Sequence, residues 1–261
     1  MAKLNAFAVW GLLKELRMAA ADTRPLVVSG PLAAQLAKEL SRGGDGRLVR
    51  VDGRVDGAAL LVRVIGGAPT EEDERQLKAA KRARIPVIAV QTGGEVVDIP
   101  YVLPTDVVMV PPGSGFPLEE VAAAIAVRLG EAGTGLAARL PVLREAVCQA
   151  LIEQFSRKNA VVGAAVWVSG ADFALLTLNQ LRLVLRLAAA HGVEIDQQRL
   201  PEVLTTIGAG VGFRALARRL VAAVPAARWL VRGSVAYAGT RALGETAHRY
   251  FHAVGETEAA V

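Results

Sequence analysis

The sequence predicts a chain of two parts, an α/β domain built on a parallel sheet followed by an all-α helical domain. Short apolar runs alternate with helical segments in the first half, and the hydrophobic periodicity is helical throughout the second. Alternating strands and helices are typical of a parallel sheet covered on both faces. Aromatic residues make up only 5% of a composition dominated by Ala, Leu and Val, which favours packed helices and buried parallel strands over an aromatic-rich β-sandwich.

The N-terminal segment 1–22 predicts an amphipathic helix rather than a signal peptide. Its apolar run is interrupted by Lys14, Glu15 and Arg17 and leads to no cleavage site. The large apolar side chains can share one broad face. We expect this face to pack on the domain that follows, with binding to a membrane surface as the alternative.

The segment 23–132 carries the elements of the α/β domain. Apolar runs bounded by turn residues predict buried strands at 25–29, 47–51, 58–65, 85–90 and 105–110. Helical patterns are present at 32–40, 66–83 and 117–129. The helix within 66–83 opens with an acidic first turn, which the helix dipole favours.

The turn after the first predicted strand stands where a P-loop GTPase binds phosphate, but it lacks the side chains for that chemistry. A phosphate loop needs two glycines, a lysine that reaches the outer phosphates and a Ser or Thr that ligates Mg²⁺. Gly30 occupies the first position, and Gln35, Leu36 and Ala37 occupy the other three. Leu36 supplies no charge and Ala37 supplies no metal ligand. The sequence therefore predicts a degenerate GTPase-like domain with no cofactor.

The other GTPase signatures are also missing. The guanine-reading N-K-x-D motif would follow the strand at 85–90, where the sequence reads QTGG at 91–94. Without an Asp there, nothing accepts both guanine N–H donors. The D-x-x-G loop that binds Mg²⁺ would lie near Asp52 and Asp56, and neither has a glycine three residues later. The alternative is an ordinary α/β domain whose element order only resembles that of a GTPase.

Beyond residues 131–141 the pattern is helical, and we place the domain boundary there. The predicted helical domain spans 141–254 and is followed by a tail at 255–261. Its candidate helices are 141–157, 159–190, 196–222 and 226–254. Nine glycines punctuate this domain. Because a glycine costs about 1 kcal/mol in a helix interior, we interpret them as points of close helix–helix approach.

The apolar stretch 161–178 reaches the lower length limit for a membrane-spanning helix, about 18 residues. Asp172 lies inside it, and Arg182 follows soon after. An ionisable residue at membrane depth needs a partner. We therefore expect a soluble helical bundle, with membrane-surface association and bilayer-crossing helices as alternatives.

Two blocks of the second half carry a resemblance to a known family. The first, NAVVGAAVWVSGADFALLTLNQLRLVLRLAAAHG, is similar to an apolar segment followed by an Asp, L-T-x-x-Q and an arginine-bearing helix ending in Gly. The second, GAGVGFRALARRLVAAVPAARWLVRGSVAYAGTRALGETAHRYF, is similar to a block with Gly-Phe, a central Pro and A-Y-x-G-T-x-A-x-G. On these blocks the domain resembles the YcjF-like family, helical domains of uncharacterised function often fused to small GTP-binding domains. The resemblance implies a GTPase-like N-terminal partner, membrane proximity and no catalytic residues.

The net charge of +5 lies entirely in the second half. Residues 1–135 hold 16 basic and 16 acidic side chains, and the rest of the chain holds 14 and 9. With Glu245 as the only nearby acid in the sequence, a predicted basic face contains Arg214, Arg218, Arg219, Arg228, Arg232, Arg241 and Arg249. Such a face favours an anionic membrane surface or an acidic protein partner. Few aromatics and no recognition motif disfavour nucleic acid.

Asp172 predicts a buried ion pair with an arginine, Arg182 first, that holds two helices in register. Ion or ligand binding at Asp172 is the alternative. We interpret Tyr237, Gly239 and Thr240 as a small-residue packing surface. Gly239 would admit another helix, and the Thr240 hydroxyl would bond to a carbonyl one turn earlier.

His248 and His252 lie four residues apart, with Glu245 three residues before His248. This spacing can bind zinc, but we interpret it as a solvated helix end and expect no metal. Cys148 is the only cysteine, which excludes an intrachain disulfide and argues against a cysteine-based zinc site. We expect it to be an inert residue of an apolar helix.

The sequence thus predicts a non-catalytic, pseudo-GTPase-type scaffold or regulatory protein that forms homo-oligomers. Its basic helical domain would associate with a membrane surface or a protein partner. A single cysteine fits a reducing cytoplasmic setting, at the inner face of the cell membrane if the membrane hypothesis holds. The alternatives are an integral membrane component anchored by C-terminal helical hairpins and an atypical nucleotide-binding enzyme.

Overall fold

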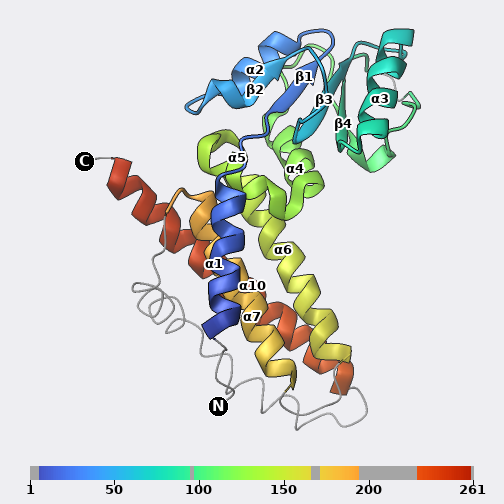
Figure 1. Cartoon of the computed structure of the whole chain (residues 1–261). Coiled ribbons are helices and arrows are strands. Elements are labelled where there is room, and N and C mark those ends of the chain that lie inside the picture. The colour runs from blue at the N-terminus through green and yellow to red at the C-terminus, as the bar shows by residue number, and fades with distance from the viewer. Residues whose placement is uncertain (1–5, 95–96, 166–170, 194–227, 260–261) are drawn as a thin grey trace. The chain divides into compact units, whose positions relative to one another are not determined.

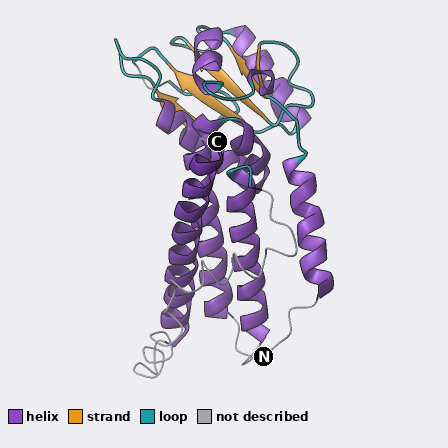
Figure 2. Cartoon of the chain, turned by 90° about the vertical axis from the view of Figure 1, so that its left-hand side faces the viewer, coloured by secondary structure: helices purple, strands orange, loops and turns teal. Residues whose placement is uncertain are grey.

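The chain folds into two units, one mixed α/β and one helical. The computed structural model describes residues 6–94, 97–165, 171–193 and 228–259. The α/β unit is Ala21–Val147, and the helical unit combines Met1–Ala20 with Cys148–Val261. Among the described residues, every strand lies in the α/β unit (Figure 2). The predicted fold class is confirmed at this coarse level.

The sheet of the α/β unit has five strands, all parallel, in the order β2-β1-β3-β4-β5. In chain order they are β1 (Leu26–Ser29), β2 (Val49–Val51), β3 (Leu60–Ile65), β4 (Val87–Gln91) and β5 (Val107–Met109). Each strand lies within a predicted run or extends one residue beyond it. All five strands start one or two residues later than predicted. In β2 and β5 the reason is a short 3-10 turn, η1 (Gly46–Leu48) or η2 (Pro104–Asp106), that takes up the first predicted residues.

Helices cover both faces of this sheet (Figure 1). They are α2 (Ala33–Leu40), α3 (Glu71–Ala83), α4 (Leu118–Leu129) and the short α5 (Thr134–Arg139), with the 3-10 turn η3 (Gly130–Gly133) between the last two. The chain moves from β1 to β2 in one direction along the sheet and from β3 to β4 in the other. Right-handed crossovers therefore place α2 and α3 on opposite faces.

The core between the sheet and α3 is built from branched aliphatic side chains. Val27, Leu61 and Leu77 belong to it and are fully buried. Each such side chain contributes roughly 1.5–3 kcal/mol on burial. All six residues of β3 are buried, as expected for a central parallel strand. One of them is the charged residue Arg63, which needs a polar partner there.

The helical unit contains four described helices. They are α1 (Ala6–Ala20), α6 (Pro141–Ala165), which begins in the α/β unit, α7 (Ala171–Ala190) and α10 (Arg228–Ala259). The predicted break after residue 157 is wrong, because α6 continues without interruption to Ala165. No Gly or Pro stands near residue 158 to end the helix. The predicted helix at 196–222 lies outside the described residues.

Helix α1 confirms the predicted amphipathic segment but belongs to the helical unit, not to the α/β domain that follows it in sequence. Its buried Leu12 and Leu16 pack against Leu181 and Leu185 of α7. The sequence did not predict this partner because the two helices are separated by about 150 residues.

Helices α6 and α10 approach each other closely at glycines. A Cβ added at Gly163 would lie 2.9 Å from the Ala236 Cβ and 3.0 Å from the Arg232 carbonyl oxygen. A Cβ added at Gly233 would lie 3.0 Å from the Ala160 carbonyl oxygen. The interpretation of these glycines as sites of close helix approach is confirmed, and the approach is within one chain.

Of the described residues, one helical stretch is long and apolar enough to cross a membrane, Leu118–Arg139, with a mean hydropathy of 1.3. Half of the residues in its most apolar 18-residue segment are buried inside the protein. The stretch 161–178, singled out from sequence, includes residues outside the described ranges.

Candidate functional site

The ligand-binding edge of a doubly wound parallel sheet lies outside the carboxyl ends of its strands, where the strand order reverses. In this sheet the reversal falls between β1 and β3. The turns beginning at Gly30 and Gly66 flank it. This edge is where the degenerate phosphate loop was predicted.

The turns at this edge pack directly on neighbouring backbone through glycines. Gly30 has φ +102°, and a Cβ added there would lie 2.1 Å from the carbonyl oxygen of Val64. A Cβ added at Gly93, after β4, would lie 2.8 Å from the Cα of Gly67, after β3. Only glycine permits these approaches. The turns after β1, β3 and β4 are therefore packed closely against neighbouring backbone.

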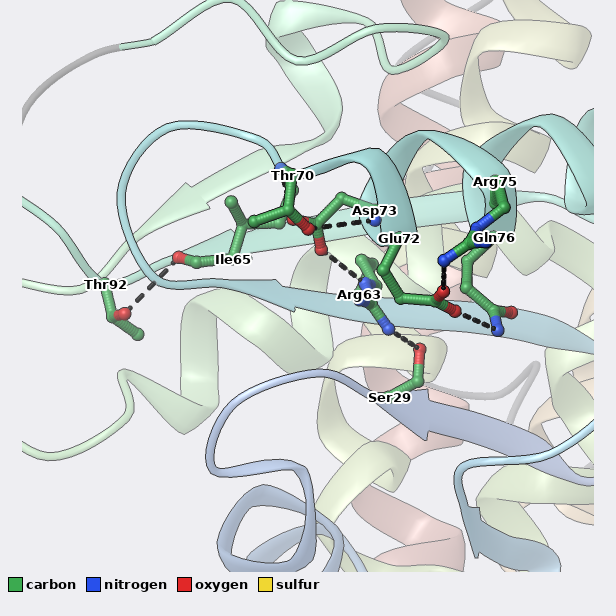
Figure 3. Close-up of polar contacts among 9 residues, drawn as sticks. All are labelled: Ser29, Arg63, Ile65, Thr70, Glu72, Asp73, Arg75, Gln76 and Thr92. Atoms are coloured by element: carbon green, nitrogen blue, oxygen red, sulfur yellow. Dashed lines mark hydrogen bonds and ion pairs between the residues drawn. The ribbon is translucent and has the colours of Figure 1, made fainter.

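The polar side chains at the edge bond to one another (Figure 3). The Arg63 guanidinium donates from Nε to Asp73 Oδ1 at 2.7 Å and from Nη1 to the Ser29 hydroxyl at 3.0 Å. The Arg63 and Asp73 side chains are only 7% and 5% exposed. This buried ion pair ties the ends of β1 and β3 to the first turn of α3.

Asp73 also caps α3. Its Oδ2 accepts hydrogen bonds at 2.7 Å from the Thr70 amide and at 2.7 Å from the Thr70 hydroxyl, and its own amide donates to that hydroxyl. Burial works to raise the pKa of Asp73, but the bonds from Thr70 and the pairing with Arg63 outweigh it and hold the pKa below its usual value. The carboxylate thus satisfies the Thr70 amide and the Thr70 hydroxyl satisfies the Asp73 amide, so two amides at the start of α3 are paired within the chain. Unpaired amides at a helix N-terminus would attract an external anion.

Helix α2 places two of the predicted phosphate-loop residues in the core. Leu36 is fully buried and Ala37 is 6% exposed, so both belong to the core. Gln35 is exposed. The residue that precedes the helix, Leu32, has φ 60° and no side-chain cap bond. Position 36 could therefore not direct a lysine toward a phosphate without leaving the core.

The segment QTGG at 91–94 joins the ends of two strands. The Thr92 amide and hydroxyl both donate to the Ile65 carbonyl oxygen, at 2.9 and 3.3 Å, and the second bond is drawn in Figure 3. Asp52 and Asp56 lie in the exposed turn after β2, where Asp56 pairs with Arg54. Neither carboxylate belongs to the edge cluster of Ser29, Arg63 and Asp73.

In the helical unit, Arg182 has a different acidic partner from the one predicted. Arg182 and the nearly buried Arg186 each bond to a carboxylate oxygen of Glu15 at 2.8 Å. Asp172 and Arg182 both lie on α7, and ten residues of helix separate their Cα atoms by about 15 Å. That is too far for the predicted ion pair between them. The side chain of Asp172 lies outside what the structure describes.

The predicted basic face is divided. Arg214, Arg218 and Arg219 lie outside the described residues, as does the side chain of Arg228. Arg232 and Arg241 are nine residues apart on α10, which puts them on opposite sides of a helix with 100° per residue. Arg249 is exposed.

Arg241 is neutralised by neighbours. It bonds to Glu153 of α6 at 3.2 Å and to Glu245 at 2.9 Å. The Tyr237 hydroxyl donates to Glu153 at 2.6 Å; with Arg157 and Arg241 it holds the pKa of Glu153 below its ordinary value. Glu153 is the acid that the sequence could not assign to this face.

A buried polar network joins α6, α7 and α10. The Thr240 hydroxyl accepts from Asn159 Nδ2 at 2.8 Å and from Gln180 Nε2 at 3.3 Å, and Asn179 donates to Asn159 at 2.8 Å. Thr240 was predicted to bond within its own helix, and these bonds come from two other helices. An added Cβ on Gly239 would meet nothing within 4 Å among the described residues, so the structure gives that glycine no helix neighbour.

Cys148, His191 and His248 gather at one buried place in the helical unit. The Cys148 Sγ lies 3.8 Å from His191 Nε2, which lies 3.0 Å from His248 Nδ1. All three residues are buried, and one potential ligand atom from each lies within 4.8 Å of the others. The sequence suggested His248 with His252 and Glu245, and it did not single out His191. Because positions 148, 191 and 248 are 43 and 57 residues apart, no sequence motif could have predicted this cluster.

Comparisons with protein-family models, curated proteins and solved structures give no match for this chain. The resemblance to the YcjF-like family and the GTPase-like interpretation of the α/β unit therefore stay predictions.

Proposed function

We propose that this protein is a non-catalytic scaffold of the pseudo-GTPase type, whose α/β unit binds no nucleoside triphosphate. The observation that carries the proposal is the bonding of Arg63 to Asp73 and Ser29 at the reversal point of the sheet. The basic side chain that could hold a phosphate there is buried and bound to a carboxylate of the same chain.

Two further features support this function. Close contacts at glycines hold the turns after β1, β3 and β4 against neighbouring backbone, which favours a packed edge over an open phosphate loop. Leu36 and Ala37 are core residues, so the positions of the phosphate-binding lysine and the Mg²⁺-binding hydroxyl serve packing.

Nucleotide binding is tested by calorimetry and thermal shift with GTP, GDP and ATP in the presence of Mg²⁺. At a ligand concentration 100 times Kd, a binding site would stabilise the fold by about 2.7 kcal/mol. For a protein of this size that corresponds to a rise in Tm of roughly 5–10 °C. We expect no shift and no heat of binding.

A shift of that size with any of the three nucleotides would contradict the proposal. The variant Arg63→Met would then locate the ligand, because binding at this edge should be lost with the guanidinium.

The helical unit is the proposed interaction module, and an anionic membrane surface is its first candidate partner. Arg249 is exposed, whereas Arg241 is bound by Glu153 and Glu245. An arginine near an anionic surface contributes about 1 kcal/mol, or roughly a fivefold change in affinity. Arg249→Gln should therefore weaken co-sedimentation with anionic vesicles at low salt about fivefold, and Arg241→Gln should have less effect.

Binding of the wild type should also weaken at high salt, since the Debye length falls from about 10 Å at 0.1 M to about 3 Å at 1 M. A wild type that never sediments with the vesicles would exclude the membrane hypothesis and leave an acidic protein partner. Self-association, proposed from the apolar composition of the second half, is measured by light scattering on the same samples.

A further inference from the structure

The four cysteine and histidine residues of the whole chain lie close together. The sequence contains one cysteine and three histidines. Cys148, His191 and His248 form the buried cluster, and the His252 ring centroid lies 6.1 Å from that of His191 and 6.4 Å from that of His248. These residues come from α6, the end of α7 and α10, which are far apart in sequence.

We propose that Cys148, His191 and His248 form a binding site for one transition-metal ion, Zn²⁺ in the first place. In a tetrahedral zinc site with Zn–N near 2.0–2.1 Å and Zn–S near 2.3 Å, two nitrogen ligands lie about 3.3 Å apart and a sulfur and a nitrogen about 3.5 Å apart. The distances in the cluster are 3.0 Å between the two ring nitrogens and 3.8 Å between Sγ and Nε2. These two distances need to change by only a few tenths of an ångström. The third distance, between Cys148 Sγ and the His248 ring nitrogen, is within 4.8 Å and has to reach about 3.5 Å in a tetrahedral site, so metal binding requires the side chains to close around the ion.

The ligand types select the metal. A thiolate and two imidazoles suit Zn²⁺ or another soft or borderline ion, whereas Mg²⁺ and Ca²⁺ prefer oxygen ligands. Three protein ligands leave a fourth position, which we assign to a water molecule rather than to His252. His252 is exposed and follows His248 by one helical turn.

The local fold holds His191 in place and suits a cation. The His191 amide donates to the carbonyl oxygens of Leu187 and Ala188 at the end of α7, and Gly192 follows with φ +76°. The carboxyl end of a helix carries partial negative charge and stabilises a nearby cation. One thiolate leaves a bound Zn²⁺ with a net charge of +1, which this helix end would stabilise.

The burial of the cluster favours a structural metal site over a catalytic one. Cys148 is fully buried, so a substrate could not reach the thiol, and a Cys–His nucleophile is not supported. A metal at this place would link three helices of the helical unit, including α6 and α10 at the level of the cluster. Metal binding would therefore stabilise the fold.

The test uses the full chain, stripped with a chelator and titrated with Zn²⁺ or Co²⁺. We expect one metal per chain by elemental analysis, a Tm higher by roughly 5–10 °C at 100 times Kd, and a thiolate-to-cobalt charge-transfer band. Because Cys148 is the only cysteine, that band can come from no other residue of the chain.

Cys148→Ala should abolish the charge-transfer band and the Tm shift, and His248→Ala should weaken both. His252→Ala is the matched control, because its removal leaves all three proposed ligands in place. Circular dichroism without metal checks that each variant is folded. Wild type without a charge-transfer band and without a Tm shift would overturn the proposal, and the cluster would then be a hydrogen-bonded His–His pair beside a thiol.

Discussion

Restoring a phosphate-loop lysine at position 36 should unfold the α/β unit rather than create a nucleotide site. Leu36 is fully buried on α2. A lysine there must either bury its charge or give up its proton. Lowering its pKa from about 10.4 to below 7 costs roughly 4–5 kcal/mol at 1.36 kcal/mol per unit. That is a large part of the 5–15 kcal/mol by which a typical domain is stable.

The matched control is the neighbouring position. Gln35 is exposed, so Gln35→Lys adds the same charge to the same helix and should change stability by no more than about 0.5 kcal/mol. Urea unfolding followed by circular dichroism measures both variants. We expect Leu36→Lys to lose about 4 kcal/mol, or more than 10 °C in Tm.

Adding Ala37→Thr to Leu36→Lys should leave GTP binding undetectable by calorimetry. The reasoning would be refuted if the double variant kept the wild-type Tm and bound GTP with micromolar affinity. Residue 36 would then face the ligand side of the loop, and the α/β unit would be a recently inactivated GTPase.

Three other predictions test the interior contacts. Gly163→Ala should lower the free energy of unfolding although alanine favours a helix, because its Cβ would lie 3.0 Å from a carbonyl oxygen of α10. Gly239→Ala, whose Cβ would meet nothing within 4 Å, should raise the free energy of unfolding by up to about 1 kcal/mol. Equal effects of the two variants in thermal unfolding would disprove the close approach at Gly163. Asp73→Asn should cost about 3 kcal/mol by breaking a buried ion pair. Because the pKa of Asp73 is lowered in the folded state, its carboxylate contributes to stability above about pH 3.9, and this contribution is lost as the pH falls through the folded pKa. The difference in unfolding free energy between wild type and Asp73→Asn should therefore become smaller in acid. A difference that did not change with pH would exclude the Asp73 charge as the cause of the destabilisation. Glu15→Gln should lower the free energy of unfolding by about 1–2 kcal/mol, because it removes the carboxylate bonded to the buried Arg186. Limited proteolysis of this variant should then cut α1 first. An unchanged cleavage pattern would show that the contacts of Leu12 and Leu16 with α7 hold α1 without the ion pair.

Local sequence determined the elements of the α/β unit. Runs such as 58–65 are apolar at nearly every position, and a strand buried on both faces has that pattern. Helix α3 carries its own start signal in Thr70 and Asp73, three residues apart, and the capping box forms as such spacing requires. The absence of a lysine and a hydroxyl from the loop after β1 is likewise a local property of the sequence.

Contacts between distant segments could be decided only by the tertiary structure. Arg63 reads as an exception in an apolar strand, and its partners lie 10 and 34 residues away. Glu15 meets Arg182 and Arg186 across more than 160 residues of chain. The burial of Leu36 depends on which side of α2 faces the sheet. The apolar pattern of a helix of only eight residues predicts that side weakly.

The cluster of Cys148, His191 and His248 is the clearest case of a site that the sequence could not predict. Its members are separated by 43 and 57 residues, so no motif spacing joins them, and the pair that sequence did suggest, His248 with His252, involves one exposed residue. Periodicity and capping are properties of a single segment, and the sequence by itself determined those. The packing of α6, α7 and α10 brings side chains of three segments to one point, because burial of apolar faces selects the helix pairs and their register. Only that packing decided that the single cysteine of the chain lies beside two of its three histidines.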